Sequence, residues 1–201
     1  MKPNLTINRL KNAAKDFCQR ESEYPNPDLY GVTDGKAVGT YIEHKFQDYL
    51  SQEFSYAKGS SARGIDLPGR LNTNIKVTSI TQPQSSCPFK DAKQKIFGLG
   101  YNLLVIVYQK EDEPKNSTAK LDFLSCIFLD KKKTGDYTIT YRLREMIDDG
   151  AAKEDITAFL SDRNIPADEI MLDQIAKQVL NEKPEQRLPF HFQCLTMEIT
   201  I

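Results

Sequence analysis

Several classes of protein are excluded by what this chain of 201 residues has little of. Its four cysteines are widely spaced without a C-x-x-C pair and it has two histidines, so neither a zinc site nor a disulfide framework is indicated. No apolar run approaches the ~20 residues that cross a bilayer, and the first residues lack the apolar segment of a signal peptide. We therefore expect a soluble, cytoplasmic protein with reduced thiols, several of them in the core.

An excess of charge is also missing, because the net charge is -1 and does not mark the chain as a nucleic-acid binder. The local distribution of charge differs from this average. A phosphate backbone experiences the local field. Between Lys58 and Lys95 the chain has seven basic residues and only two acidic residues, Asp66 and Asp91. The basic residues are Lys58, Arg63, Arg70, Lys76, Lys90, Lys93 and Lys95. These side chains either attract a phosphate backbone or solvate one face of the fold.

The pattern with the clearest chemistry is Gly64-Ile65-Asp66, followed after seven residues by Asn74-Ile75-Lys76. The stretch is typical of a β-hairpin, which would place Asp66 and Lys76 at the ends of two neighbouring strands. Alternation predicts that Asn74 and Lys76 share one face of their strand while Ile75 enters the core. The carboxylate would hold a hard divalent cation, and the ammonium would act on the attacking water or on the charge that develops at phosphorus. This pattern favours phosphodiester hydrolysis.

A helix predicted from about residue 36 to residue 53 supplies a second carboxylate. Its buried stripe consists of Val38, Ile42, Phe46, Tyr49 and Leu50. Glu43 lies next to this stripe, and Gly39, one turn earlier, has no side chain that blocks access to it. A carboxylate there can be half-buried and still reach the edge of a sheet. Alternatively, Glu43 is a helix-surface residue that pairs with Lys36 or Gln47.

The order of these residues resembles that of the PD-(D/E)xK nuclease superfamily and, within it, the type II restriction endonucleases. In that superfamily a helical Glu precedes a strand-end Asp and then an (Asp/Glu)-x-Lys strand. This chain offers Glu43, Asp66 and Asn74-Ile75-Lys76, and the resemblance covers residues 36–110. Ile65 stands in place of the Pro, which only shapes the turn. Asn74 stands in place of the acidic residue and removes one negative charge, which favours a single metal ion over two.

The resemblance implies an α/β fold of the restriction-endonuclease type, with a mixed central sheet flanked by helices. It implies Mg²⁺-dependent, site-specific cleavage of double-stranded DNA, with Asp66, the backbone carbonyl of Ile75 and Glu43 as metal ligands. Asp66, Asn74, Lys76 and Glu43 would form the catalytic set. Palindromic recognition further implies a symmetric homodimer. Two alternatives are a repair or recombination nuclease of the same fold and a catalytically silent nucleic-acid-binding module, for which Asn74 would mark decay.

Sequence readout requires side chains that reach the floor of a DNA groove, and polar residues near the proposed site are the candidates. Two prolines exclude regular structure from residues 82–88. The candidate DNA-binding residues are Gln82, Gln84, Ser85, Ser86, Lys90 and Lys93. The loop alternatively serves only as a structural turn.

The whole chain, residues 1–201, is expected to form a single nuclease domain with residues 36–110 as its catalytic core. No internal repeat divides it. Strands are predicted to begin near residues 54–57, to run through the apolar residues 103–108 and the segment 121–129, and to close the chain between Phe190 and Met197. A turn is predicted over residues 111–120.

Helices are predicted over residues 5–21 and 89–97, the second as the crossover between two strands. Residues 138–183 are expected to form a helical subdomain, the C-terminal addition to the fold. Its helices are predicted near residues 141–147, 156–160 and 170–180. The last two resemble a helix-turn-helix outline that could enter a major groove. Their acidic composition also fits a subdomain for packing or dimerisation.

Overall fold

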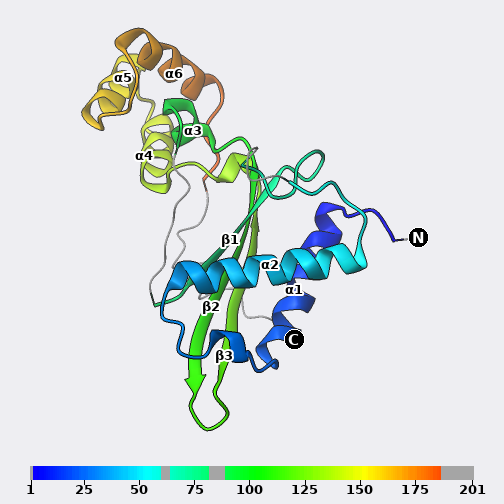
Figure 1. Cartoon of the computed structure of the whole chain (residues 1–201). Helices are drawn as coiled ribbons and strands as arrows, with labels where there is room; N and C mark the ends of the chain where they lie inside the picture. Colours follow the sequence, from blue (N-terminus) through cyan, green and yellow to red (C-terminus); the bar gives the residue numbers. More distant parts are fainter. Residues whose placement is uncertain (1, 60–63, 82–88, 187–201) are drawn as a thin grey trace. The chain divides into compact units, whose positions relative to one another are not determined.

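The computed structural model describes residues 2–59, 64–81 and 89–186 (Figure 1). The chain divides into two compact units. Of the described residues, the first unit contains 2–59, 64–81 and 102–129, and the second contains 89–101 and 130–186. The strand predicted between Phe190 and Met197 lies outside the described residues.

The first unit is a mixed sheet with helices packed against it, which confirms the predicted α/β fold. Within the described residues the sheet has three strands in the order β1-β2-β3. They are β1 (Thr73–Ser79), β2 (Asn102–Glu113) and β3 (Thr118–Leu129). β1 pairs parallel with β2, and β2 pairs antiparallel with β3. Helix α2 (Gly35–Glu53) packs against β1, and helix α1 (Ile7–Ser22) packs against β3 (Figure 1).

β2 is the central strand because its apolar run can be buried on both faces. Each of residues 103–108 is at most 6 % exposed, as the sequence predicts. Leu104, Ile106 and Tyr108 join the core that α1 and α2 cover. The parallel pairing of β1 with β2 requires a crossover connection, and this connection contains helix α3 (Ala92–Phe97). α3 begins three residues later than predicted because Asp91 caps it, accepting a 2.8 Å hydrogen bond from Gln94 N.

One predicted strand is not formed, and one predicted turn has the wrong length. Residues 54–57 form no regular strand, since Ser55 makes only an isolated bridge with Asn4. The neighbouring Pro3 has no N–H with which to continue a ladder. The turn predicted over residues 111–120 is shorter, because β2 and β3 extend on both sides of Pro114. Glu111 pairs directly opposite Lys120, and opposite charges in that position support the ladder.

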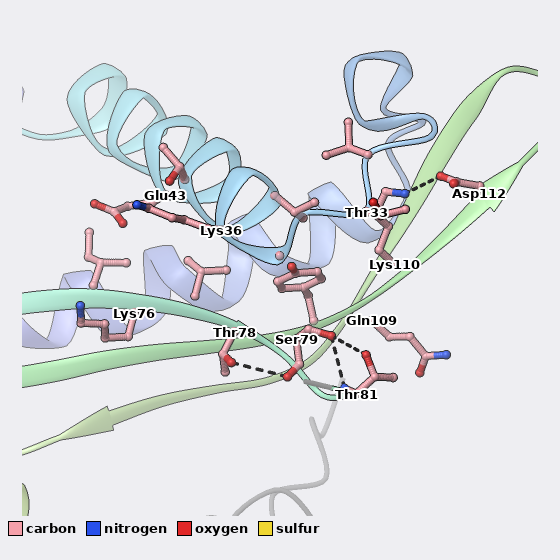
Figure 2. A pocket seen from close by; sticks show the side chains of 18 residues that line it. Thr33, Lys36, Glu43, Lys76, Thr78, Ser79, Thr81, Gln109, Lys110 and Asp112 are labelled. Carbon is pink, nitrogen blue, oxygen red and sulfur yellow. Dashed lines mark hydrogen bonds and ion pairs between the residues drawn. The ribbon is translucent and has the colours of Figure 1, made fainter. Parts of the chain in front are cut away.

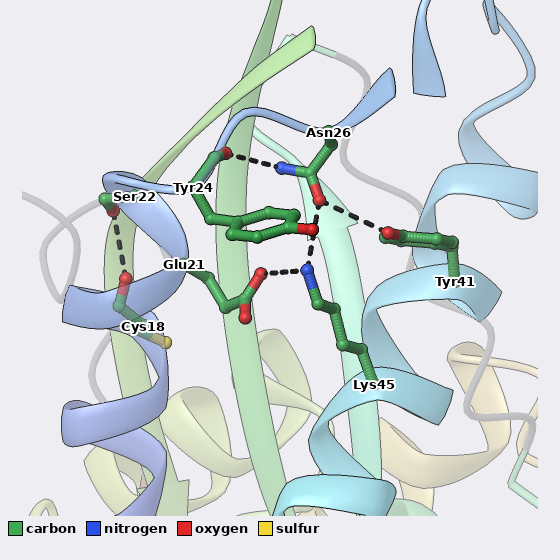
Figure 3. A network of polar contacts seen from close by, with 7 residues as sticks. All are labelled: Cys18, Glu21, Ser22, Tyr24, Asn26, Tyr41 and Lys45. Carbon is green, nitrogen blue, oxygen red and sulfur yellow. Dashed lines mark hydrogen bonds and ion pairs between the residues drawn. The ribbon is translucent and has the colours of Figure 1, made fainter. Parts of the chain in front are cut away.

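A polar network around Lys45 fixes α2 to the rest of the first unit (Figure 3). Lys45 Nζ lies 2.6 Å from Glu21 Oε2 on α1 and donates a 3.2 Å hydrogen bond to Asn26 Oδ1. Tyr41, also on α2, donates a 3.3 Å hydrogen bond to the same oxygen. The Asn26 backbone exchanges two 2.9 Å hydrogen bonds with Ala119 of β3. α2 therefore has its rotation and height above the sheet fixed by polar contacts as well as by its apolar stripe.

Two of the cysteines lie in the part of the chain that the structure describes. Cys18 on α1 is buried, Cys126 on β3 is half-buried, and both are free. A hydrogen bond with the Cys126 thiol, followed by burial, raises the pKa of Cys18, so this thiol stays protonated. Reduced thiols are thus confirmed for these two residues, whereas Cys87 and Cys194 lie outside the described residues.

The second unit is helical in its described part. After a short 3₁₀ helix, η3 (Lys131–Lys133), come α4 (Tyr137–Asp148), α5 (Lys153–Asp162) and α6 (Glu169–Asn181). These elements confirm the helices predicted in the C-terminal part. α4 begins earlier than predicted because Asp136 accepts a 3.0 Å hydrogen bond from Ile139 N. Among the residues that the structure describes, no helix combines the length and apolar character needed to cross a bilayer.

Candidate active site

α2 presents Glu43 beside its buried face. Asp34 caps the helix by accepting a 2.9 Å hydrogen bond from Lys36 N, and the stripe that includes Ile42 enters the core as predicted. Glu43 is half-buried and accepts a 3.2 Å hydrogen bond from Gln47 Nε2. The helix-surface pairing with Gln47 is therefore present, and it leaves the second carboxylate oxygen of Glu43 for another partner.

Gly39 brings α2 close to β1. A Cβ built on Gly39 would lie 3.4 Å from the backbone oxygen of Val77, and Gly39 is buried. A side chain larger than Ala at this position would push the helix away from the strand. The glycine that the sequence suggested as an opening to Glu43 thus also sets the distance between helix and strand.

The predicted hairpin is present only as one isolated antiparallel bridge between Leu67 and Thr73, and residues 64–66 form no strand. The bridge still brings Asp66 against the edge of β1. Leu67 and Thr73 exchange two backbone hydrogen bonds of 3.0 Å. Asp66 Oδ2 then accepts a 2.8 Å hydrogen bond from Ile75 N. Because the N–H and C=O of one strand residue point to the same edge, the Ile75 carbonyl faces the edge that carries Asp66.

Asn74 holds the chain on which Asp66 lies. Its Oδ1 accepts a 3.0 Å hydrogen bond from Asp66 N, and its Nδ2 donates a 3.0 Å hydrogen bond to the Gly64 carbonyl. The side chain is 8 % exposed. Gly64 has a φ of 64°, a conformation that glycine adopts without strain. The amide clamps both ends of the Gly64–Asp66 turn, a contact that an acidic side chain at position 74 could make only in part because a carboxylate cannot donate.

A groove with a volume of about 480 Å³ lies between α2 and β1 and extends to β2. Glu43, Ile75 and Lys76 line it, so the structure brings the predicted helical carboxylate and the predicted lysine together. Figure 2 shows Lys36 and Glu43 on α2 at one side of the groove and Lys76, Thr78 and Ser79 along β1 at the other. Asp66 and Asn74 do not line the groove. Asp66 is hydrogen-bonded to the lining residue Ile75, and the Asn74 side chain is hydrogen-bonded to Asp66.

The groove also contains polar residues that the sequence analysis did not identify. They are Thr33, Lys36, Thr40, Thr78, Ser79, Thr81, Gln109, Lys110 and Asp112. Lys110 lies 2.5 Å from Asp112, and Asp112 accepts a 3.3 Å hydrogen bond from Gly31 N. Lys36 precedes Glu43 by seven residues, two helical turns, which is a spacing that could have revealed it. Lys110 could not be found in this way, since only the parallel pairing of β2 with β1 brings it there.

The charges of Asp66 and Lys76 act on the ionisation of Glu43. Burial raises the pKa of Glu43 above its ordinary value of 4.5, and the Asp66 carboxylate raises it further. Lys76 and His44 act in the opposite direction. Asp66 and Lys76 are therefore both close enough to Glu43 for their charges to affect its ionisation.

The oxygen atoms in this region fit a hard divalent cation. Glu43 and Asp66 repel each other and share a partly buried environment, a situation that a cation relieves. The Ile75 carbonyl adds a neutral oxygen at the same edge. No cluster of three His, Cys, Asp or Glu side chains suited to a metal occurs in the described part of the chain. A cation here would thus need the backbone oxygen or ligands from solvent and substrate, as Mg²⁺ commonly has.

None of the predicted DNA-contacting residues is among the described residues of the first unit, which contains the groove. Lys90 and Lys93 belong to the second unit, and both are exposed. Gln82, Gln84, Ser85 and Ser86 lie outside the described residues, as does Arg63 of the basic stretch.

Comparison with known proteins identifies the family. The family described as "Type II restriction enzyme NspV" matches residues 4–188. The chain is 51% identical over 182 residues to the type II restriction enzyme NspV of Nostoc sp. (strain ATCC 29411 / PCC 7524), which covers 90% of this chain and 82% of the relative. No solved structure matches. The predicted resemblance to type II restriction endonucleases is confirmed, and this chain belongs to the NspV family of type II restriction enzymes.

Proposed function

We propose that this restriction endonuclease hydrolyses DNA with Mg²⁺ at a site formed by Glu43, Asp66 and Lys76. The observation that carries the proposal is that Asp66 and Lys76 both lie close enough to Glu43 for their charges to act on its ionisation. Two carboxylates and a lysine in one place are the groups that metal-assisted phosphodiester hydrolysis requires. The position of Glu43 and Lys76 in one groove adds to this support.

Each protein group has a distinct role in the proposal. Asp66, the Ile75 carbonyl and Glu43 would hold the metal ion. Bound Mg²⁺ would polarise the scissile phosphate and lower the pKa of a bound water. Lys76 would position or deprotonate the attacking water and stabilise the charge that develops on the phosphate oxygens. Asn74 would act as a positioning residue, because its amide fixes the backbone on either side of Ile65 and so the direction of the Asp66 carboxylate.

A type II enzyme that cuts both strands of a palindrome needs one such site for each strand, so we propose a symmetric homodimer. Sedimentation velocity of the free protein and of its complex with a duplex would test this state. Twice the mass of the chain is expected for the protein part of both species. A protein that binds and cleaves duplex DNA as a monomer at all concentrations would contradict the dimer.

Removing either central group should abolish cleavage. Asp66→Ala and Lys76→Ala are each expected to lower the cleavage rate by more than ~100-fold, since the first removes a ligand of the metal ion and the second removes the cation that would stabilise the developing charge. Asp66→Asn keeps an acceptor for Ile75 N and should be as inactive. Digestion of plasmid DNA into discrete bands gives the rate, with Lys115→Ala, exposed in the β2–β3 turn, as a control. A residual rate within ~10-fold, about 1.4 kcal/mol of barrier, would refute the assignment.

Glu43→Gln should have opposite effects on activity and stability. The Mg²⁺ concentration for half-maximal cleavage is expected to rise roughly tenfold or more, because a ligand charge is lost. The raised pKa of Glu43 means that its charged form is unfavourable in the folded protein, so without metal the variant should be more stable at neutral pH. This gain should vanish below pH 4.5, where Glu43 is protonated in both states. Urea unfolding with EDTA and a Mg²⁺ titration provide the two measurements. An unchanged Mg²⁺ requirement would return Glu43 to the role of a surface residue paired with Gln47.

Substitutions of Asn74 should distinguish positioning from general stability. Asn74→Asp keeps an acceptor for Asp66 N and loses the bond to the Gly64 carbonyl, whereas Asn74→Ala loses both. We expect cleavage to be far lower for Asn74→Ala than for Asn74→Asp, and the difference to depend on the Mg²⁺ or Mn²⁺ concentration. Both variants should remain folded at the assay temperature. Near-wild-type cleavage by Asn74→Ala at every metal concentration would show that Asp66 does not depend on this amide.

A further inference from the structure

Two segments of the second unit, residues 89–99 and 130–136, are packed backbone to backbone. A Cβ on Gly98 would lie 2.1 Å from the Lys131 carbonyl oxygen, so only glycine permits this approach. Leu99 N donates a 2.8 Å hydrogen bond to Thr134 Oγ1, and Asp136 N donates a 2.8 Å hydrogen bond to the Lys95 carbonyl. The end of α3 and the 3₁₀ helix η3 are therefore held side by side.

This packing brings together lysines that are distant in the sequence. We name them the lysine patch, and they are Lys90, Lys93, Lys95, Lys131, Lys132 and Lys133. Lys95 is half-buried and the other five residues are exposed. The two segments contain six lysines against three aspartates. The patch is positive although the whole chain has a net charge of -1.

The three aspartates are directed toward backbone groups. Asp91 caps α3 and Asp136 caps α4, while Asp130 accepts a 3.0 Å hydrogen bond from Lys132 N at the start of η3. An ion pair between Lys132 and Glu182 is 3.8 Å long and exposed at both ends, so it holds the lysine only weakly. The carboxylates thus serve the fold, and most of the ammonium groups lie at the surface.

We infer that the lysine patch binds phosphate groups of the DNA backbone and adds affinity without sequence preference. This inference rests on the proposed action on DNA. Lysine is a compact point charge without the planar fork that reads base edges, and phosphate contacts carry no sequence information. Protein interfaces are depleted in lysine, which argues against a protein partner. The patch would supply the attraction to DNA that the net charge of the chain does not provide.

The number of phosphates contacted is smaller than the number of lysines. Successive side chains of a 3₁₀ helix point about 120° apart, so Lys131, Lys132 and Lys133 cannot all face one DNA strand. Lys90 and Lys93, three residues apart, belong to the other segment. Two to three phosphates are a reasonable complement for the whole patch, and this expectation is measurable from the salt dependence of binding.

The test compares a triple variant, Lys90→Gln/Lys93→Gln/Lys133→Gln, with wild type in binding a fluorescent mixed-sequence duplex. Ca²⁺ replaces Mg²⁺ to prevent cleavage, and anisotropy gives Kd between about 50 and 200 mM NaCl. The slope of log K against log salt should become shallower by about 2, so that the loss of affinity over this range is roughly tenfold smaller. Affinity at the low-salt end should fall by at least ~10-fold.

Two control variants make the outcome specific. Lys11→Gln/Lys15→Gln/Lys115→Gln removes the same charge from exposed positions of the first unit and should leave the slope unchanged. Lys90→Arg/Lys93→Arg/Lys133→Arg keeps the positive charge at the same three positions and should have the wild-type slope. Equal slopes for wild type and the Gln triple variant, with wild-type cleavage intact, would overturn the lysine patch alone. A wild-type protein that neither binds nor cuts DNA would overturn the proposed function and the lysine patch together. If the Gln triple variant keeps the wild-type slope but loses binding of polyglutamate that the wild type shows, the lysine patch would be assigned to a protein partner instead.

Discussion

β1 can form hydrogen bonds along two edges, and the candidate active site depends on what each edge meets. On one edge the strand pairs in parallel with β2. On the other edge Thr73 pairs with Leu67, but the next available N–H, that of Ile75, is bonded by the carboxylate of Asp66 instead of by another strand. A charged side chain thus stands where a ladder would continue, and the adjacent Ile75 carbonyl shares its edge. The Asn74 amide keeps this arrangement in place from within the same strand.

The helix that completes the site is held at a defined distance from this edge. Gly39 allows α2 to approach Val77, and Lys45, two residues after Glu43, is bonded to α1 and to the loop that pairs with β3. Glu43 is consequently half-buried near Asp66, a position that raises its pKa and makes its charge unfavourable in the absence of a counter-ion. Such an arrangement lowers stability at neutral pH, and a bound cation would offset the repulsion between the two carboxylates.

The division of the chain into two units follows from the parallel pairing of β1 with β2. A parallel connection must cross from one end of the sheet to the other, and this chain places α3 in that crossover. α3 then packs with the segment that follows β3, so the two excursions from the sheet form one helical unit. In our proposals the first unit carries the chemistry and the second contributes phosphate contacts, a separation that lets affinity and catalysis be altered independently.

Local patterns in the sequence were sufficient for much of this protein. The stripe from Val38 to Leu50 predicted α2, the run from Leu103 to Tyr108 predicted a strand buried on both faces, and the order Glu43, Asp66, Lys76 predicted the family. These features depend on side-chain periodicity and on short-range geometry, which a single segment contains. The first residues of α3 and α4 were predicted less accurately, because apolar spacing does not show that the side chains of Asp91 and Asp136 cap these helices.

Tertiary structure decided what the segments do together. In the sequence Asn74 stands where the family pattern has an acidic residue. Its side-chain amide forms hydrogen bonds with Gly64 and Asp66, and these can form only when residues 64–66 fold back against β1. Lys110 reached the groove through strand pairing, and the lysine patch arose where Gly98 admits the Lys131 carbonyl. In each case the deciding contact joins atoms of different segments, at least eight residues apart along the chain, and periodicity within one segment carries no information about such contacts.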